Sequence, residues 1–225
     1  MDKIPFQKFN LSFWLLVCLD LLALLIGVHW LHSIVKPLLM PALTLLLVSA
    51  TDHSFPRRTL VLTGLFFSWL GDIFLLLESN YPILFVAGLC SFLITHLCYI
   101  IYFLSIKAAA GSLIKKQPFY IVLILGYGAG LVWLLFPYLG DLKIPVILYA
   151  AVICTMLLCS LHIFLKLTVP SNRYFIAGAM LFVISDSLLA INKFYQPLAF
   201  AGTLTMLTYC AAQYFIVRGF IKRRY

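Results

Sequence analysis

The stretch TLVLTGLFFSWLGDIFLLL, residues 59–77, decides the fold of this chain because it is long, apolar and carries one charge. At about 1.5 Å of rise per residue, a helix of this length crosses most of the ~30 Å hydrocarbon core of a bilayer. The one charge is Asp72. Carrying a carboxylate into hydrocarbon costs roughly 2.5–3.5 kcal/mol on insertion scales, and such residues usually serve an ion path, a proton relay or a reaction. Asp72 is therefore a candidate functional residue.

Further apolar stretches of similar length lie on both sides of this one. Together they predict eight membrane spans, at about residues 11–31, 34–50, 59–77, 82–106, 119–138, 144–165, 174–191 and 197–217. The chain has 225 residues, of which 64% are hydrophobic and 10% are charged, too little polar surface for a soluble domain. We therefore predict an all-α, polytopic membrane protein in which residues 1–225 form one integral membrane domain.

The basic residues predict which side of the membrane each end of the spans faces. With a cytoplasmic N-terminus, 13 of the 16 Lys and Arg residues lie on the cytoplasmic side, and Lys36, Lys143 and Lys193 lie on the other. Because cytoplasmic loops carry an excess of basic residues, both termini are predicted to be cytoplasmic. The net charge of +9 reflects this bias and attraction to anionic headgroups, and it is no evidence for nucleic acid. We expect a bacterial inner membrane, with an organelle membrane as the alternative.

Asp186 lies in a second apolar run, at a position 114 residues beyond Asp72. Other residues recur at the same offset: Pro56 and Pro170, Gly64 and Gly178, Leu75 and Leu189, Tyr81 and Tyr195, Leu84 and Leu198, Gly88 and Gly202. The pattern predicts two four-helix halves, residues 1–110 and 111–225, with the same topology and related by an axis along the membrane normal. The match is weak in the first two spans of each half, and coincidence within a leucine-rich composition is the alternative.

Equal depth in two related halves would let the carboxyl groups of Asp72 and Asp186 face one cavity. Each lies about six residues, or ~9 Å, from the outer end of its predicted span. Two buried carboxyl groups that share a site are not expected both to be ionised, because burial and mutual repulsion disfavour the second charge. A neutral acid would then donate a proton beside an anion that accepts one, which suits hydrolysis by an activated water.

Polar residues on neighbouring spans are candidate substrate-binding or supporting groups. The predicted set is Lys36, Asn80, His96, Tyr99, Tyr149, Ser185, Asn192, Tyr209 and Gln213. Tyr149 matches the depth of the aspartates, whereas His96 is about 21 Å from the outer end of its span. Helix packing explains His96, Tyr99, Tyr209 and Gln213 when each is taken singly. Lys36, Asn80, Asn192 and Lys193 lie nearer the surface, where they could meet a phosphate, although snorkelling also explains the two lysines.

Three other features carry weaker predictions. Asp20, a third acid in the first span, has no counterpart at the 114-residue offset, so a salt bridge, a hydrogen bond and a cavity-lining role stay open. No metal site or cofactor is predicted, because no H-x-x-x-H or H-E-x-x-H occurs and the cysteines form no C-x-x-C. Gly126 and Gly130 form a G-x-x-x-G, which predicts close helix packing.

Five short motifs follow one another along nearly the whole chain. They are Lys36-Pro37-Leu38; Gly71-Asp72; His96 with Tyr99; Ser185-Asp186 with Leu189-Ala190; and Tyr209-Cys210-Ala211-Ala212-Gln213. Their order and spacing resemble those of YhhN-type membrane proteins, a family that includes the lysoplasmalogenases. The resemblance implies hydrolysis of the vinyl ether bond of lysoplasmalogens, giving a fatty aldehyde and a glycerophospho-choline or -ethanolamine. A lysophospholipid and the lipid bilayer are the implied partners.

The aspartate pair suits that chemistry independently of the resemblance. Vinyl ethers hydrolyse by protonation at carbon, which a neutral carboxyl group could perform, and the partner carboxylate could stabilise the resulting cation and orient water. A small proton-coupled transporter is the alternative, since it too needs intramembrane acids and repeated halves. It would move its substrate unchanged, with flux that responds to a pH gradient. A lipid-binding protein with the same cavity would bind lipid without turnover. A carrier is weakly disfavoured, because Pro37 and Pro41 are expected near a helix start rather than in mid-membrane.

Overall fold

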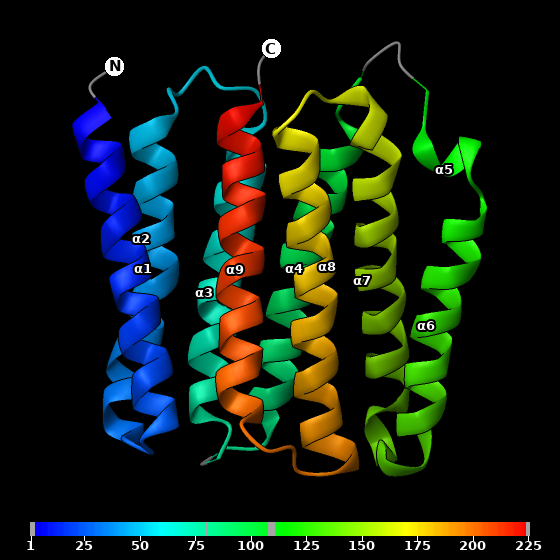
Figure 1. Ribbon diagram of the computed structural model, residues 1–225. Helices are drawn as coiled ribbons and strands as arrows, with labels where there is room; N and C mark the ends of the chain where they lie inside the picture. The colour runs from blue at the N-terminus through cyan, green and yellow to red at the C-terminus, as the bar shows by residue number, and fades with distance from the viewer. Residues whose placement is uncertain (1–2, 80, 108–110, 224–225) are drawn as a thin grey trace. The chain divides into compact units, whose positions relative to one another are not determined.

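The computed structural model describes residues 3–79, 81–107 and 111–223, so the predicted site residue Asn80 lies outside the described residues. The eight long helices are α1 (Lys3–Leu25), α2 (His29–Ala50), α3 (Arg58–Leu77), α4 (Ile83–Leu104), α6 (Phe119–Leu135), α7 (Lys143–Ile163), α8 (Ser171–Ala190) and α9 (Ala201–Lys222) (Figure 1). The short helices are α5 (Leu113–Lys116), η1 (Phe136–Tyr138), η2 (Gly140–Leu142), η3 (Phe164–Lys166) and the π-helical turn η4 (Ile191–Tyr195). Within these described ranges, eight helical segments are long and apolar enough to cross a membrane. The prediction of an all-α membrane protein with eight spans is confirmed.

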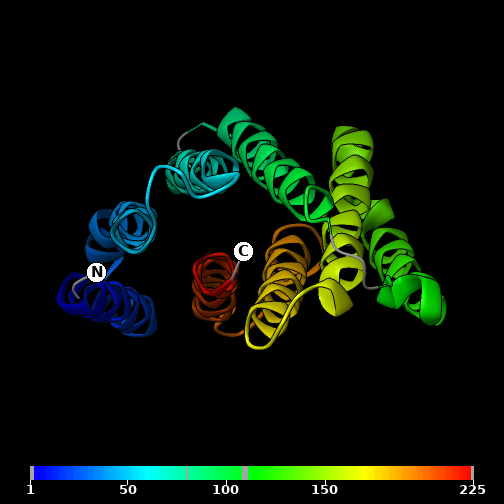
Figure 2. The ribbon, with the colours of Figure 1, turned by 90° about the horizontal axis from the view of Figure 1, so that it is seen from above.

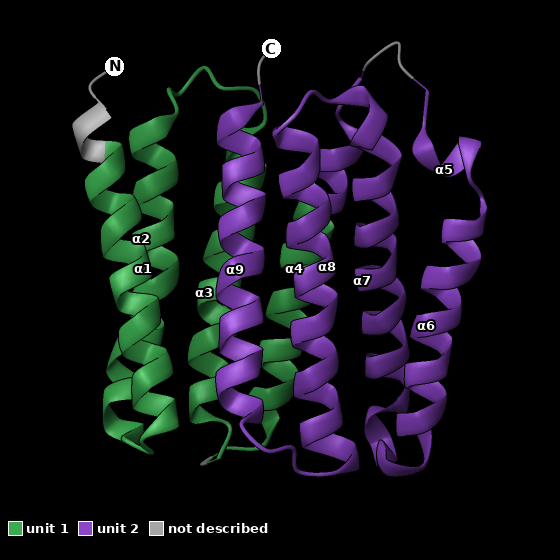
Figure 3. Ribbon diagram, viewed as in Figure 1, with its two compact units in different colours: residues 1–99 green, residues 100–225 purple. Residues whose placement is uncertain are grey.

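The chain divides into two compact units, residues 1–99 and 100–225 (Figure 3). In the first unit, α1 packs beside α2 and α2 beside α3, and the N-terminal part of α4 completes the unit. In the second unit, α6 packs beside α7, α7 beside α8 and α8 beside α9 (Figure 2). Within each unit, the consecutive long helices that pack together are thus antiparallel and joined by short connections. The parallel repeat of residues 1–110 and 111–225 stays a prediction.

The first predicted span, residues 11–31, is wrong at its C-terminal end. Helix α1 ends at Leu25 and α2 begins at His29. Between them Gly27 has a φ of 73°, in the left-handed region that glycine adopts at little cost. The neighbouring turn residues Ile26 and Val28 are as apolar as the helices, so hydropathy alone does not detect the turn.

Pro37 and Pro41 lie inside α2, not near its start. Because proline has no N–H, Pro41 cannot donate to the carbonyl of residue 37, and an unpaired carbonyl in hydrocarbon costs several kcal/mol. Trp69 of α3 supplies the missing donor, with its Nε1 2.9 Å from the carbonyl oxygen of Pro37. This bond lets α2 continue through both prolines, and it fixes the depth of α3 against α2.

The G-x-x-x-G of α6 does not mediate helix packing in the part of the chain that the structure describes. A Cβ added to Gly126 or Gly130 would meet no atom within 4 Å. Gly128, between them, is the glycine that faces a neighbour, since a Cβ there would lie 2.7 Å from Sγ of Cys154 on α7. The prediction for Gly126 and Gly130 is therefore wrong, because the spacing of small residues does not show which helix face has a partner.

Candidate active site

Asp72 lies on the buried face of α3, five residues before that helix ends at Leu77. Only 2% of Asp72 is exposed. A glycine precedes it because α4 comes very close at this point: a Cβ added to Gly71 would lie 2.6 Å from the ring of Phe92. The local sequence thus buries a carboxyl group on α3, next to a tight contact between α3 and α4.

A hydroxyl network joins α3 to α4 one helical turn away from Asp72. Thr95 Oγ1 lies 3.0 Å from Ser68 Oγ and donates to the carbonyl oxygen of Gly64 at 3.0 Å. Between apolar helices such bonds satisfy polar groups that have no access to water. Neither Ser68 nor Thr95 was among the predicted site residues.

The structure places two predicted supporting residues, His96 and Tyr99, beside this network and deeper than Asp72. His96 follows Thr95 directly, and the ring of Tyr99 packs over Gly64, where an added Cβ would lie 2.8 Å from it. Gly64 precedes Asp72 by eight residues on α3, which is about 12 Å along the helix. Tyr99 therefore packs about two helical turns from Asp72 along α3.

The third acid, Asp20, is paired with a histidine of the next helix. Oδ1 of Asp20 lies 2.8 Å from Nδ1 of His32, close to the turn that connects α1 and α2. Asp20 is 1% exposed, and the side chain of His32 is 14% exposed. Within the described ranges, no third His, Cys, Asp or Glu joins them in a group that could hold a metal ion. Of the three roles left open for Asp20, the structure shows a hydrogen-bonded pair that becomes a salt bridge when His32 is protonated.

Asp186 lies on α8, four residues before that helix ends at Ala190. Tyr149 of α7 donates its phenolic O–H to Oδ2 of Asp186 at 2.5 Å. Hydrogen bonds of the O–H···O⁻ type are typically 2.5–2.7 Å long and about twice as strong as neutral ones. The structure thus brings together the second candidate aspartate and the tyrosine that sequence analysis placed at matching depth.

A second hydrogen bond from a tyrosine to α8 lies next to the bond between Tyr149 and Asp186. Tyr127 of α6 donates to Oγ of Ser187 at 2.8 Å, and Ser187 Oγ donates to the carbonyl of Val183 at 2.6 Å. Ser187 follows Asp186 directly, so two neighbouring residues of α8 each accept a phenolic hydrogen bond from a different helix. Sequence analysis missed Tyr127, because nothing in its local sequence distinguishes it from the other aromatic residues of the spans.

Two further predicted residues, Ser185 and Asn192, bind backbone groups. Ser185 Oγ donates to the carbonyl oxygen of Thr205 on α9 at 3.0 Å. Asn192 Oδ1 accepts from the N–H of Leu198 at 3.0 Å, across the connection between η4 and α9. The first bond holds α9 against α8 and the second orders the connection between η4 and α9, so both have a structural role.

The remaining predicted residues are buried. Tyr209 and Gln213 lie one helical turn apart on α9 and are 4% and 0% exposed. The ring of Tyr209 makes an edge-to-face contact with Phe182 of α8, with ring centroids 5.6 Å apart. Lys36 lies on α2 and is 8% exposed. This exposure is low for a lysine at a membrane surface, where snorkelling would carry the side chain into water.

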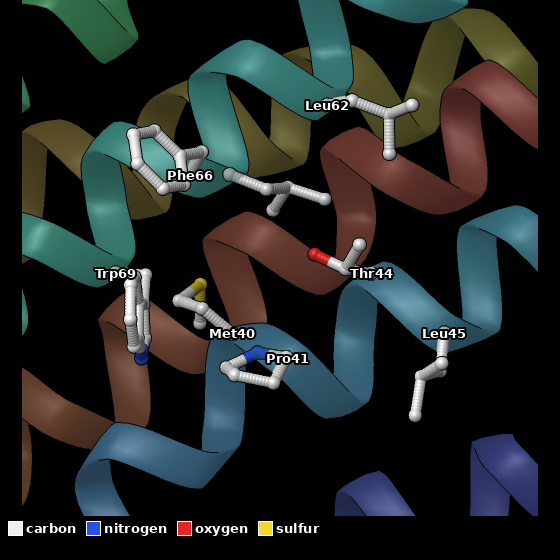
Figure 4. A pocket seen from close by; sticks show the side chains of 8 residues that line it. Met40, Pro41, Thr44, Leu45, Leu62, Phe66 and Trp69 are labelled. Atoms are coloured by element: carbon white, nitrogen blue, oxygen red, sulfur yellow. The ribbon is translucent and has the colours of Figure 1, made fainter.

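An apolar groove lies between α2 and α3 in the first unit (Figure 4). Its volume is about 400 Å³, and its lining residues are Met40, Pro41, Thr44, Leu45, Leu62, Leu65, Phe66 and Trp69. Leu45 and Phe66 are each 51% exposed, so the groove opens on the side of the unit where lipid chains would lie. Trp69 at one end of the lining is three residues from Asp72 on α3.

Comparison with known proteins identifies the family of the chain. The YhhN family model matches residues 31–220. The protein named lysoplasmalogenase from Mycobacterium tuberculosis is 29% identical over 201 residues, which cover 86% of this chain and 73% of that protein. Lysoplasmalogenase TMEM86A of Homo sapiens is 30% identical over 206 residues, with coverage of 87% and 80%, and lysoplasmalogenase TMEM86B of Sus scrofa is 31% identical over 192 residues, with coverage of 83% and 74%. No solved structure matches the chain. The predicted resemblance is confirmed, and the chain belongs to the YhhN family.

Proposed function

We propose that this chain is a membrane hydrolase that cleaves the vinyl ether bond of lysoplasmalogens, with Asp72 and Asp186 acting on the same substrate molecule. The family and the names of its relatives support the reaction class. The observation that carries the mechanism is that α3 of the first unit and α8 of the second unit each carry one aspartate, five and four residues from the helix end. We further propose cytoplasmic termini and a bacterial inner membrane, which would place both aspartates toward the external face.

The reaction needs one proton donor and one proton acceptor. A neutral carboxyl group transfers its proton to the alkenyl carbon that does not carry the ether oxygen. The neighbouring carbon, which is bonded to that oxygen, becomes part of an oxocarbenium ion. Water adds to this cation and gives a proton to the carboxylate that the first step left behind, while the other carboxylate stays ionised throughout. The hemiacetal then breaks to the fatty aldehyde, and its proton passes to the departing glycerol oxygen. One water is consumed and the acid and base are restored, which is general acid–base catalysis without a cofactor.

The hydrogen bond from Tyr149 assigns the two roles in this proposal. A phenolic donor stabilises the ionised form of the carboxyl group that accepts from it. We therefore assign Asp186 as the carboxylate that stabilises the oxocarbenium ion and orients water. Asp72 is then assigned as the group that supplies the proton, because the mechanism needs one acid beside the carboxylate.

Tyr149→Phe should lower kcat for aldehyde release about 10- to 100-fold and leave KM nearly unchanged. A hydrogen bond to a charged group is worth ~1.5–3 kcal/mol, and the charge on Asp186 matters most in the transition state. The matched control is Tyr127→Phe, which removes the neighbouring bond to the neutral Ser187 and should keep kcat within about twofold. Equal losses in the two variants would show that Tyr149 only packs α7 against α8.

The proposed function is tested by incubating the purified chain with an alkenyl-lysophospholipid and measuring released aldehyde. The saturated alkyl ether of the same headgroup is the control, because it has no double bond to protonate and should not be cleaved. In heavy water, the aldehyde trapped immediately by reduction should carry one deuterium on the carbon next to the carbonyl. Recovery of intact lipid would refute hydrolysis, and transport of that lipid into vesicles in response to a pH gradient would favour the transporter.

A further inference from the structure

Lys36 is a buried cation that the structure pairs with no carboxylate. It lies seven residues into α2, is 8% exposed, and forms no ion pair with any described residue. The nearest titratable group on its own helix face is His32, one turn earlier, and that imidazole is already bound to Asp20. An ammonium group largely withdrawn from water is destabilising unless an opposite charge and hydrogen bonds compensate it. No described residue thus supplies a negative charge to Lys36, and an anionic ligand could supply it.

Lys36 lies at the depth in the membrane where the headgroup of a lipid would lie if its ether bond reacted near Asp72. The hydrogen bond between Trp69 and the Pro37 carbonyl places α2 and α3 side by side. This bond lies within about one helical turn of Lys36 along α2 and of Asp72 along α3. Side chains on a helix tilt toward its N-terminus, and α2 and α3 run in opposite directions. The Cα–Cβ bond of Lys36 thus tilts toward the α1–α2 turn, and that of Asp72 toward the membrane interior.

The apolar groove of Figure 4 continues from Lys36 along the same side of α2. Met40 and Thr44 follow Lys36 at intervals of one helical turn, and both line the groove. Its volume of about 400 Å³ lies within the ~300–1,000 Å³ of sites that enclose small ligands. Lys36, Asp72 and the lining residues Met40 and Trp69 thus lie within about one helical turn of one another along α2 or along α3.

We infer that Lys36 binds the phosphate of a single-chain phospholipid, and that the groove between α2 and α3 receives the hydrocarbon chain of the same molecule. Phosphate and vinyl ether oxygen sit on the two terminal carbons of one glycerol, so a lipid held at Lys36 presents its ether a short distance deeper. This inference rests on the proposed function and adds to it a requirement for the phosphate group. It also makes Lys36 a substrate-binding residue rather than a snorkelling one.

The test compares two substrates that differ only in the phosphate, an alkenyl-lysophospholipid and the corresponding alkenylglycerol. Lys36→Met should raise KM for the phospholipid about 10- to 100-fold, as expected for loss of a charged hydrogen-bond partner, and leave KM for the alkenylglycerol unchanged. Lys36→Arg keeps the charge and should recover most of the affinity. Lys143→Met is the matched control, since Lys143 is exposed at the start of α7 with its ammonium over the ring of Phe136, and it should behave as wild type.

The outcomes separate this inference from the proposed function. No aldehyde from the wild-type chain with either substrate refutes the proposed function itself. Aldehyde from the wild type, with Lys36→Met affecting both substrates equally or neither, overturns the role of Lys36. Millimolar inorganic phosphate should not inhibit aldehyde release from the phospholipid. If phosphate inhibits the wild type but not Lys36→Met, and Lys36→Met affects both lipids equally, then Lys36 belongs to a site for free phosphate instead.

A second variant tests the groove independently of Lys36. Thr44→Phe fills the groove and should lower kcat/KM for a long-chain alkenyl substrate about tenfold, because the hydrocarbon chain loses apolar surface that it would bury, while a short-chain substrate is spared. Thr155→Phe makes the same change on an exposed position of α7 and should have no effect. Equal loss for both chain lengths, or no loss at all, would mean that ordinary bilayer lipid covers the groove.

Discussion

Asp72→Asn and Asp186→Asn are each expected to lower kcat/KM for aldehyde release by about 10²–10⁴-fold, the contribution typical of a positioned acid or base. Asn has nearly the shape of Asp but can neither hand over a proton nor carry the negative charge that stabilises an oxocarbenium ion. Because the two residues act on one molecule in the proposed mechanism, the double variant should be little worse than either single variant. The measurement is aldehyde release from a purified alkenyl-lysophospholipid.

The controls for this prediction come from exposed aspartates between the long helices. Asp52→Asn and Asp141→Asn make the same chemical change at exposed positions in connections of the first and second unit, and both should keep wild-type activity. Thermal unfolding in detergent should be similar for all four variants, which separates loss of chemistry from loss of fold. Retained turnover in Asp72→Asn or Asp186→Asn would contradict the assignment. Losses that multiply in the double variant would show that the two residues act independently.

Hydropathy was sufficient to predict the architecture, because a helix that crosses hydrocarbon must be apolar over its whole length. It failed where the chain turns without becoming polar. The turn at Gly27 is flanked by Ile26 and Val28, and it was assigned to the first span. The position of Pro41 within α2 was also missed, since its cost is removed by Trp69 of the next helix, a tertiary contact that no local pattern contains.

The candidate site was predicted in part for a similar reason. Asp72 and Asp186 stand out in the sequence because the cost of burying a carboxyl group applies in any fold. Tyr149 was found from its depth alone, which the helix rise supplies. The partner of Asp20 was not predicted, because His32 meets it only after the chain has turned at Gly27. Depth along a span can be estimated from sequence, whereas the direction in which a side chain points depends on helix packing.

Glycines show the same limit, since sequence shows that a residue is small but not what lies against it. Gly178 of α8 is packed against backbone of α9: an added Cβ would lie 2.9 Å from the carbonyl oxygen of Ala212 and 3.0 Å from the backbone N of Ile216. It would also lie 2.7 Å from Cγ1 of Ile216. A side chain can rotate away from such a contact, but these backbone atoms belong to a helix. The methyl group of an alanine would therefore push α8 and α9 apart.

Gly178→Ala should consequently lower the free energy of unfolding by about 2–3 kcal/mol, the upper range for overpacking a well-packed interior. Aldehyde release should fall with it, because Asp186 lies two helical turns further along the same helix. Gly126→Ala is the matched control: its Cβ meets nothing within 4 Å, and alanine is the better helix former by up to about 1 kcal/mol, so stability should be unchanged or slightly higher. Thermal unfolding of both variants in detergent measures the difference. If Gly178→Ala and Gly126→Ala are equally stable, then α8 and α9 have room for the added methyl group. That result would contradict the close packing of Gly178 against α9.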